Sequence, residues 1–170
     1  MKQYVVLSHE PWQAIPTRTQ QLVTRLKRAQ VLFFEPAGSK ERKQGRQVRP
    51  GVFLYTLPSA PAVPERASLL FRRAWRRQAG QVLRAMSRHG FRDAVLWTTS
   101  PAQVHLLDHL EYGGLVYDCD REWADLSPAW EGSLAGAADL VFAASPQLRD
   151  RLSPCSSNIA LLPNGVNYSL

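Results

Sequence analysis

The chain has 170 residues, of which 45% are hydrophobic and 21% charged, a composition typical of a single soluble globular domain. No apolar run approaches the roughly 20 residues of a membrane-spanning helix, and the N-terminal MKQYVVLSHEPW lacks the length and cleavage site of a signal peptide. We therefore expect a cytoplasmic protein. The net charge of +7 favours a polyanionic partner such as nucleic acid, anionic lipid or a phosphorylated substrate.

Short apolar runs alternate along the chain with segments of helical character. The apolar runs predict strands over residues 4–7, 31–36, 52–58, 94–100, 114–119, 139–145 and 159–163. Apolar spacing, with Thr, Ser or Pro at the starts, predicts helices over residues 17–29, 67–88, 101–110, 127–137 and 145–152. Five Lys or Arg and one Glu in residues 37–50 predict a solvated loop, and the Pro-rich residues 58–65 lead into the long helix.

The predicted strands are continuous apolar runs rather than alternations of polar and apolar residues. This pattern is typical of a parallel sheet covered by helices on both faces. We therefore predict an α/β fold with a doubly wound, mostly parallel sheet of about seven strands. Residues 1–163 would form this Rossmann-like domain. The final LLPNGVNYSL begins like a buried strand that runs into an Asn-Gly turn.

Thiols and histidines give no sign of a metal centre. Without a secretion signal, Cys119 and Cys155 favour two free thiols, although the sequence leaves a disulfide open. His105 and His109 are four residues apart on a predicted helix, but the neighbouring carboxylates point elsewhere on that helix. A two-histidine site normally needs a further ligand close by, so we expect no metal site.

The long predicted helix has two contrasting sides on a helical wheel. Phe71, Trp75, Val82 and Met86 share one side, and the opposite side carries Arg66, Arg73, Arg77, Arg84 and Arg88. One interpretation is that the aromatic side packs on the sheet and the arginines are merely solvated. The other is that Arg73, Arg77 and Arg84 contact anionic lipid headgroups or a phosphorylated acceptor. Duplex nucleic acid is disfavoured because no recognised binding motif is present.

Ligands of open parallel sheets bind beyond the carboxyl ends of the strands. The candidate residues at these ends are His9, Trp12, Asp118, Asp120, Trp123 and Ser145. Asp118 and Asp120 point to opposite sides of an extended chain, so one can reach a cleft while the other caps a helix or pairs with an arginine. Trp12 can instead cover the core, and Ser145 can cap the helix that follows it.

Three common nucleotide or ester sites are disfavoured by missing motifs. The first predicted strand is not followed by GxGxxG, so a dinucleotide site is disfavoured. The chain also lacks GxxxxGK[ST] and GxSxG, which argues against a P-loop and an α/β-hydrolase.

Five segments in order carry a resemblance: WQAIPTRTQQL, VLFFEP, LVYDCDREW, GAADLVFAASPQLRDRL and IALLPNGVNY. The set resembles the N-terminal domain of GT-B glycosyltransferases of the family-4 (glycosyltransferase group 1) type, closest to the branch of teichuronic-acid biosynthesis enzymes. The resemblance covers nearly the whole chain. It implies two Rossmann-like domains, the first receiving the acceptor and the second, absent here, binding the nucleotide-sugar donor. It also implies that residues 164–170 begin the linker between them. It also implies retaining transfer without a metal.

The resemblance further implies a cleft between the loop after the first strand and the end of the fifth. The residues that it places there are His9, Trp12, Arg18, Asp118, Asp120 and Trp123. A carboxylate at this cleft would orient the acceptor hydroxyl or accept its proton. The chain departs from the family pattern where paired glycines are missing from the first loop, where Asp stands in place of a common histidine, and where Asn167 follows NGV.

We therefore expect the acceptor-binding domain of a glycosyltransferase of polysaccharide or cell-envelope glycan synthesis, inactive alone. Its partners would be a sugar or lipid-linked acceptor and the missing donor domain, with no cofactor bound by this domain. The enzyme would be cytoplasmic and possess a peripheral contact with the inner face of the membrane. The alternative is a non-enzymatic α/β binding module whose basic surface binds anionic lipid or nucleic acid.

Overall fold

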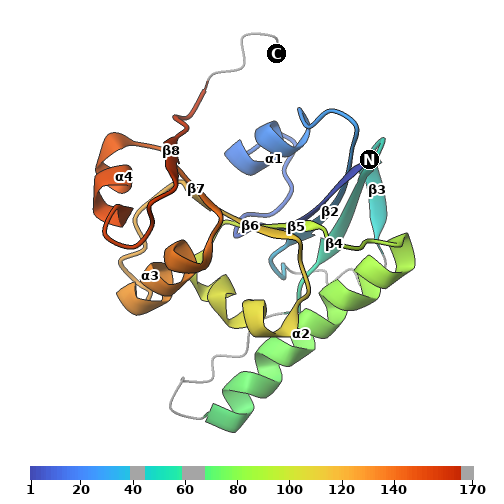
Figure 1. Ribbon diagram of the computed structural model, residues 1–170. Coiled ribbons are helices and arrows are strands. Elements are labelled where there is room, and N and C mark those ends of the chain that lie inside the picture. The colour runs from blue at the N-terminus through green and yellow to red at the C-terminus, as the bar shows by residue number, and fades with distance from the viewer. Residues whose placement is uncertain (39–44, 59–67, 166–170) are drawn as a thin grey trace.

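The computed structural model describes residues 1–38, 45–58 and 68–165, and it shows an α/β fold built on one sheet (Figure 1). The eight strands lie in the order β3-β4-β2-β1-β5-β6-β7-β8. All neighbours are parallel except the antiparallel pair β3–β4. The predicted fold class is confirmed. The strands are β1 Lys2–Leu7, β2 Ala29–Glu35, β3 Arg46–Arg49, β4 Val52–Thr56, β5 Val95–Thr98, β6 Gly114–Cys119, β7 Leu140–Ala143 and β8 Ile159–Leu161.

Helices cover both faces of the sheet. They are α1 Arg18–Val23, α2 Ser68–His89, the 3₁₀ helix η1 Pro101–His109, α3 Pro128–Ala137 and α4 Pro146–Leu152. Figure 1 shows α1 on one face and α2, η1 and α3 on the other. Right-handed crossovers explain this division, because the connection β1–α1–β2 runs in one direction across the sheet and the connection β4–α2–β5 runs in the other.

The strand order reverses between β1 and β5. The connection from β1 leads to β2 on one side, whereas β5 to β8 follow one another on the other side. A crevice forms beyond the carboxyl ends of the strands at such a switch point, and it is the usual ligand site of doubly wound sheets. The loops after β1 and β5 therefore flank the expected ligand site.

Two apolar clusters fill the two faces of the sheet. Val6 and Phe33 lie in the cluster under α1, and their neighbours Leu7 and Phe34 lie in the larger cluster under α2 and α3. Successive residues of a strand point to opposite faces, so strands buried on both sides need continuous apolar runs. Each fully buried Leu, Val or Phe contributes about 1.5–3 kcal/mol relative to an exposed one.

The apolar side predicted for the long helix is confirmed in α2. Trp75, Val82 and Met86 are buried, and Phe71 packs on the same cluster. His105 of η1 lies within an aromatic group, with ring centroids 4.7 Å from Phe71. Three of the predicted arginines, Arg73, Arg77 and Arg84, are exposed together with Arg88.

Three predicted elements differ from the structure. Residues 46–49, predicted as loop, form the edge strand β3, because Val48 packs on the cluster under α1 while the flanking arginines face outward. The helix predicted over residues 17–29 ends at Val23, and Arg28 turns the chain into β2 with a φ of 54°. The helix predicted over residues 101–110 is a 3₁₀ helix, whose threefold winding places Gln103 and Leu106 on one buried side.

Several predictions fall on residues 39–44, 59–67 and 166–170, which lie outside the described residues. They concern much of the basic loop, the Pro-rich segment, Arg66, Asn167 and most of the linker. Within the described part, no helix has both the length and the apolar character needed to cross a membrane. Both thiols are free there, Cys119 buried and Cys155 exposed.

Candidate functional site

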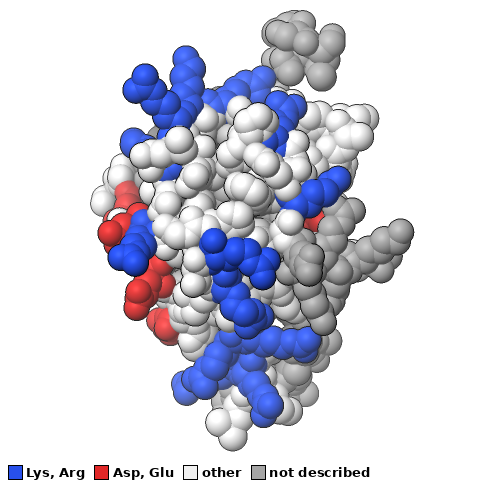
Figure 2. All heavy atoms as spheres, turned by 90° about the vertical axis from the view of Figure 1, so that its right-hand side faces the viewer, with Lys and Arg blue, Asp and Glu red and all other residues white. Residues whose placement is uncertain are grey.

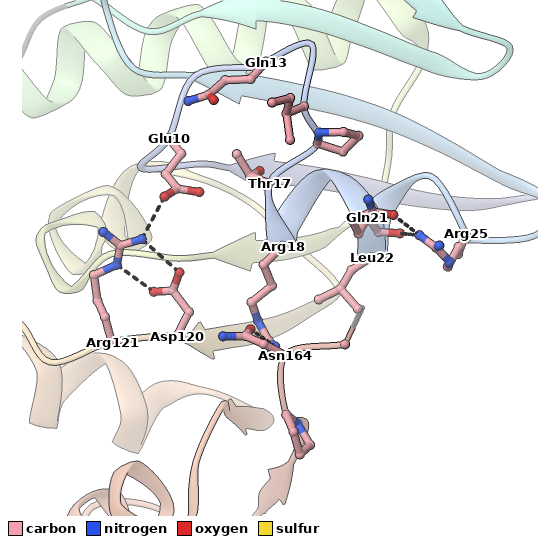
Figure 3. A pocket seen from close by; sticks show the side chains of 14 residues that line it. Glu10, Gln13, Thr17, Arg18, Gln21, Leu22, Arg25, Asp120, Arg121 and Asn164 are labelled. Carbon is pink, nitrogen blue, oxygen red and sulfur yellow. Dashed lines mark hydrogen bonds and ion pairs between the residues drawn. The ribbon is translucent and has the colours of Figure 1, made fainter. Parts of the chain in front are cut away.

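A cleft of about 850 Å³ opens beyond the carboxyl ends of β1, β6 and β8. Glu10 comes from the loop after β1, Asp120 and Arg121 follow β6, and Asn164 follows β8 (Figure 3). Helix α1 forms the side opposite Glu10 and Arg121, and its Arg18 lies beside Asn164. Strand ends from both sides of the switch point therefore line one cavity.

Local capping fixes the position of α1. Thr17 and Gln20 form a capping box, in which the Gln20 side chain accepts the Thr17 N–H at 3.2 Å. The same Gln20 amide accepts the Gln13 N–H and donates to the Gln13 carbonyl oxygen, each at 3.0 Å. A capping box satisfies the free N–H groups of a helix start. Here it also holds the preceding loop against α1, so Arg18 enters the cleft from a fixed backbone.

Arg18 joins three separate parts of the chain. Its Nη2 lies 2.9 Å from Oδ1 of Asp118 and its Nε 3.2 Å from the same oxygen, while Nη1 donates to Oδ1 of Asn164 at 2.8 Å. Asp118 is only 1% exposed. Burial raises the pKa of this carboxyl, and the hydrogen bonds from Arg18 oppose the shift. The buried carboxylate therefore depends on the guanidinium for its charge compensation.

Arg121 is held between two carboxylates at the other end of the cleft. Its Nη2 lies 2.8 Å from Oε1 of Glu10, and its Nε lies 3.1 Å from Oδ1 of Asp120 (Figure 3). The guanidinium also sits over the ring of Trp123, 5.7 Å from its centroid. Hydrogen bonding to Asp120 raises the pKa of Arg121. Hydrogen bonds from one guanidinium therefore orient both carboxyl groups.

His9 lies beneath this end of the cleft, at the switch point itself. Its backbone N–H donates to Oγ1 of Thr99 at 2.9 Å, and its Nδ1 lies 2.8 Å from the same oxygen. Its Nε2 is buried, 3.7 Å from Asp120 and 3.8 Å from Glu10, without a hydrogen-bond partner in the described part of the chain. Burial lowers the pKa of His9, which keeps the ring neutral near pH 7.

A small buried network holds Thr99 in place. The Thr99 hydroxyl donates to the Leu7 carbonyl oxygen at 3.1 Å, and the Gln103 side chain donates to the same carbonyl at 3.0 Å. Gln103 also accepts the backbone N–H of Thr99 at 2.8 Å. The ends of β1 and β5 are therefore tied together directly beneath His9, which fixes the ring under Glu10 and Asp120.

The structure separates the other predicted site residues. Trp123 packs edge-on against His9, with centroids 5.0 Å apart, and lies behind the cleft lining. Trp12 packs edge-on against Phe33 at 5.0 Å, on the cluster under α1, which supports its interpretation as a cover for the core. Ser145 accepts the Leu148 N–H at the start of α4, so its interpretation as a helix cap is confirmed.

The two strand-end aspartates have different environments, as their spacing predicted. Asp118 is buried beneath Arg18, whereas Asp120 lines the cleft. The alternative that they cap the next helix is wrong, because Ser127 occupies the cap position of α3. The extended backbone at the end of β6 turns the two side chains in opposite directions, and only Asp120 is placed to meet a ligand.

The lining residues that were missed as site candidates include Glu10, Arg25, Arg121 and Asn164. Glu10, Arg121 and Asn164 all follow strand ends within a few residues, so their positions were the available signal. Arg25 had no such signal, because it enters the cleft only through the turn after α1. Its guanidinium donates to the Gln21 carbonyl oxygen at 2.9 Å.

The cleft offers mainly hydrogen-bond acceptors and arginines that are already paired. Arg18 and Arg121 each contact a carboxylate, and among the described lining residues only Arg25 is a cation without an acidic partner. A diphosphate needs several free cations or helix N-termini. Carboxylates and amides, in contrast, suit the hydroxyl groups of a sugar. No group of three or more potential metal ligands occurs among the described residues.

Comparisons with solved structures agree with this architecture. Sucrose-phosphate synthase from Thermosynechococcus elongatus superposes with a TM-score of 0.69 and 14% identity over 98% of this chain and 49% of its own. A second structure of that synthase gives 0.68 and 14% over 98% and 91%. A structure described as trehalose-6-phosphate from E. coli bound with UDP-2-fluoro glucose gives 0.66 and 12% over 98% and 49%.

These structures are GT-B glycosyltransferases, and the likeness confirms the Rossmann-like half of that fold. The chain spans about half the length of the first synthase, at 49%. No protein-family model matches the sequence, and no curated protein matches it significantly.

Proposed function

We propose that the chain is the acceptor-binding N-terminal domain of a retaining, nucleotide-sugar-dependent glycosyltransferase of family-4 type. The observation that carries the proposal is a GT-B half-fold with a cleft of hydroxyl-binding side chains at its switch point. A sugar or a lipid-linked sugar is the acceptor, and polysaccharide or cell-envelope glycan synthesis is the process. Residues 1–163 form the domain, and a donor domain follows residues 164–170 in the complete polypeptide.

Asp120 is the residue that we assign to the acceptor. It lines the cleft, and two hydrogen bonds from the Arg121 guanidinium fix the orientation of its carboxyl group. A carboxylate in this position accepts a hydrogen bond from the attacking hydroxyl and takes its proton as the new glycosidic bond forms. The bond from the donor sugar to its phosphate breaks, and the phosphate leaves with the electron pair. Asp118 acts indirectly, by holding Arg18 in the wall of the cleft.

The donor half has to supply the groups that stabilise the leaving diphosphate. The positive charge of Arg18 and Arg121 is already compensated within this domain. Cations or helix N-termini facing the cleft from a second domain would complete the site. The structure bound with UDP-2-fluoro glucose supports a nucleotide sugar as the donor class. On this basis the domain alone binds the acceptor and is inactive in transfer.

The experiment uses the complete polypeptide and measures release of UDP from UDP-glucose in the presence of a panel of methyl glycosides. We expect Asp120→Asn to lower kcat about 10²–10⁴-fold, the usual contribution of a general base. Asp150→Asn is the matched control, because Asp150 pairs with Arg149 on the surface of α4. A wild-type kcat in Asp120→Asn would exclude Asp120 as the general base. Absence of turnover with every probe sugar in the wild type would count against the proposed activity.

A direct binding measurement tests the acceptor role in the 170-residue chain itself. Amide resonances of residues 10–13 and 120–121 should shift saturably with one of the methyl glycosides, and UDP-glucose should leave them nearly unchanged. The opposite pattern would assign the cleft to the donor. Thr99→Val, which removes the hydroxyl beneath His9, should weaken glycoside binding, whereas Asp150→Asn should not.

A further inference from the structure

The outward face of α2 combines arginines with exposed leucines. The helix carries six arginines and no acidic residue. Leu69 is 82% exposed, Leu70 is 63% exposed and Leu83 is 40% exposed. At 100° per residue the three leucines spread over about 140° of the helix surface, within the range that the six arginines cover and outside the buried side. Three large apolar side chains therefore stand exposed among the arginines, which gives this surface apolar as well as positive character.

The arginines of this face have no acidic partners in the described structure. Every salt bridge there involves other basic residues, namely His9, Arg18, Arg121, Arg149 and Arg151. Figure 2 shows Lys and Arg side chains in two groups on one face, one near the top and one over the lower half at the height of α2 in Figure 1, with most of the visible carboxylates toward one edge. The face therefore presents uncompensated positive charge.

Three of the arginines surround a recess rather than a flat surface. Arg77, Arg84 and Arg88 line a hollow of about 270 Å³, together with Tyr55 and Gln81. No carboxylate is among its described lining residues. Guanidinium groups bind phosphate oxygens through paired hydrogen bonds, so the recess has the chemistry for a phosphate headgroup.

We propose that this face of α2 docks the protein on an anionic phospholipid bilayer. The arginines contact lipid phosphates, and Leu69 and Leu70 enter the boundary between headgroups and acyl chains. The exposed leucines favour lipid over nucleic acid, because a phosphate backbone offers no apolar partner. The inference is independent of sugar transfer, since it concerns the face of the sheet opposite α1.

The docked orientation has a geometric consequence for the cleft. The Gln78 side chain donates to the Pro58 carbonyl oxygen, just beyond the carboxyl end of β4, so α2 starts on the carboxyl-end side of the sheet. Leu70 precedes Gln78 by about 12 Å of helix. Insertion of the first turn would therefore bring the carboxyl edge of the sheet, where the cleft opens, toward the bilayer.

The test is flotation of the 170-residue chain with vesicles of phosphatidylcholine alone or mixed with phosphatidylglycerol. We expect binding only to the anionic vesicles, weakening as salt is raised. The triple variant Arg73→Gln, Arg77→Gln, Arg84→Gln should weaken the partition coefficient roughly 100-fold at low salt. The triple variant Lys27→Gln, Arg92→Gln, Arg149→Gln removes the same charge from exposed sites elsewhere and should weaken it much less.

A second pair of variants separates lipid insertion from charge alone. Leu69→Ser with Leu70→Ser should weaken vesicle binding roughly tenfold, whereas Leu161→Ser, at an exposed apolar site on the edge strand β8 far from α2, should leave it unchanged. Circular dichroism checks that each variant is folded. Equal losses in the two arginine triples, or no loss in the leucine variant, would overturn the proposal. Binding of the wild type to an oligonucleotide but not to anionic vesicles would also overturn it.

Discussion

Replacing Arg18 with methionine should destabilise the fold in a pH-dependent manner, because it leaves a buried carboxylate without its partner. Asp118 is 1% exposed and receives its charge compensation from Arg18, with the closest N–O distance at 2.9 Å. Methionine keeps much of the apolar stem of arginine and removes the guanidinium. The perturbation therefore isolates the ion pair from simple loss of packing.

The magnitude follows from the burial of the pair. Removing one member of a buried ion pair costs about 3–5 kcal/mol. The carboxyl can escape part of this cost by taking a proton, and burial already raises its pKa. An acid whose folded pKa is raised destabilises the fold above that pKa, and the penalty is relieved as the pH falls through it. The destabilisation should thus be largest near pH 7.5 and smaller near pH 5.

Urea denaturation of Arg18→Met, Asp118→Asn and the double variant, at both pH values, measures these effects. The double variant should be more stable than the sum of the single changes predicts, by about 1–3 kcal/mol at pH 7.5. Arg149→Met is the control, because Arg149 pairs with Asp150 on the surface and should cost less than about 1 kcal/mol. A pH-independent loss in Arg18→Met, or additivity in the cycle, would refute the reasoning.

Three further predictions concern single residues. Burial lowers the pKa of His9, so its contribution to the free energy of unfolding is present above the unfolded pKa of about 6.5 and lost as the pH falls below it. His9→Asn should therefore reduce the slope of the free energy of unfolding against pH, measured by urea titrations between pH 7.5 and 5.5. An unchanged slope would count against a buried neutral ring. Burial raises the pKa of Cys119 to about 12, so iodoacetamide should label only Cys155 in the native protein. Mass spectrometry should then show one adduct, and two adducts without denaturant would contradict the structure. Gly51 has a φ of 77°, and a Cβ there would lie 2.9 Å from a carbonyl oxygen. Gly51→Ala should therefore lower the free energy of unfolding by about 1–2 kcal/mol, while Gly38→Ala should be nearly neutral. Equal urea midpoints for the two variants would show that Gly51 is not required by its backbone conformation.

The layered architecture could be predicted from the sequence because it depends on local signals. Strands buried on both faces need continuous apolar runs, and residues 31–36 or 114–119 show that pattern without reference to any partner strand. Edge strand β3 was not predicted as a strand because only Val48 of its four residues packs inward. Its arginines are what a solvated loop also contains, so local composition could not separate the two.

From local sequence, the candidate site could be predicted only for residues that directly follow a strand. Asp120 and Arg18, which the resemblance assigned to a cleft, both line the cavity, but their partners depend on contacts between distant segments. Arg18 and Asp118 are 100 residues apart in sequence, and Arg121 and Glu10 are 111 apart. No spacing rule links such pairs. The role of Thr99 beneath His9 likewise follows from the adjacency of β1 and β5, which local periodicity does not specify.

The distribution of charge implies that salt should separate surface attachment from ligand binding. The net charge of +7 resides largely outside the cleft, where the arginines of α2 face solvent without acidic partners in the described structure. Exposed charges are strongly screened once the Debye length falls below about 10 Å, near 0.1 M salt. The pair between Arg18 and Asp118 is buried and is screened far less. Raising the salt concentration should therefore release the protein from anionic vesicles while leaving glycoside-induced shifts in the cleft intact, and parallel loss of both would show that one surface serves both ligands.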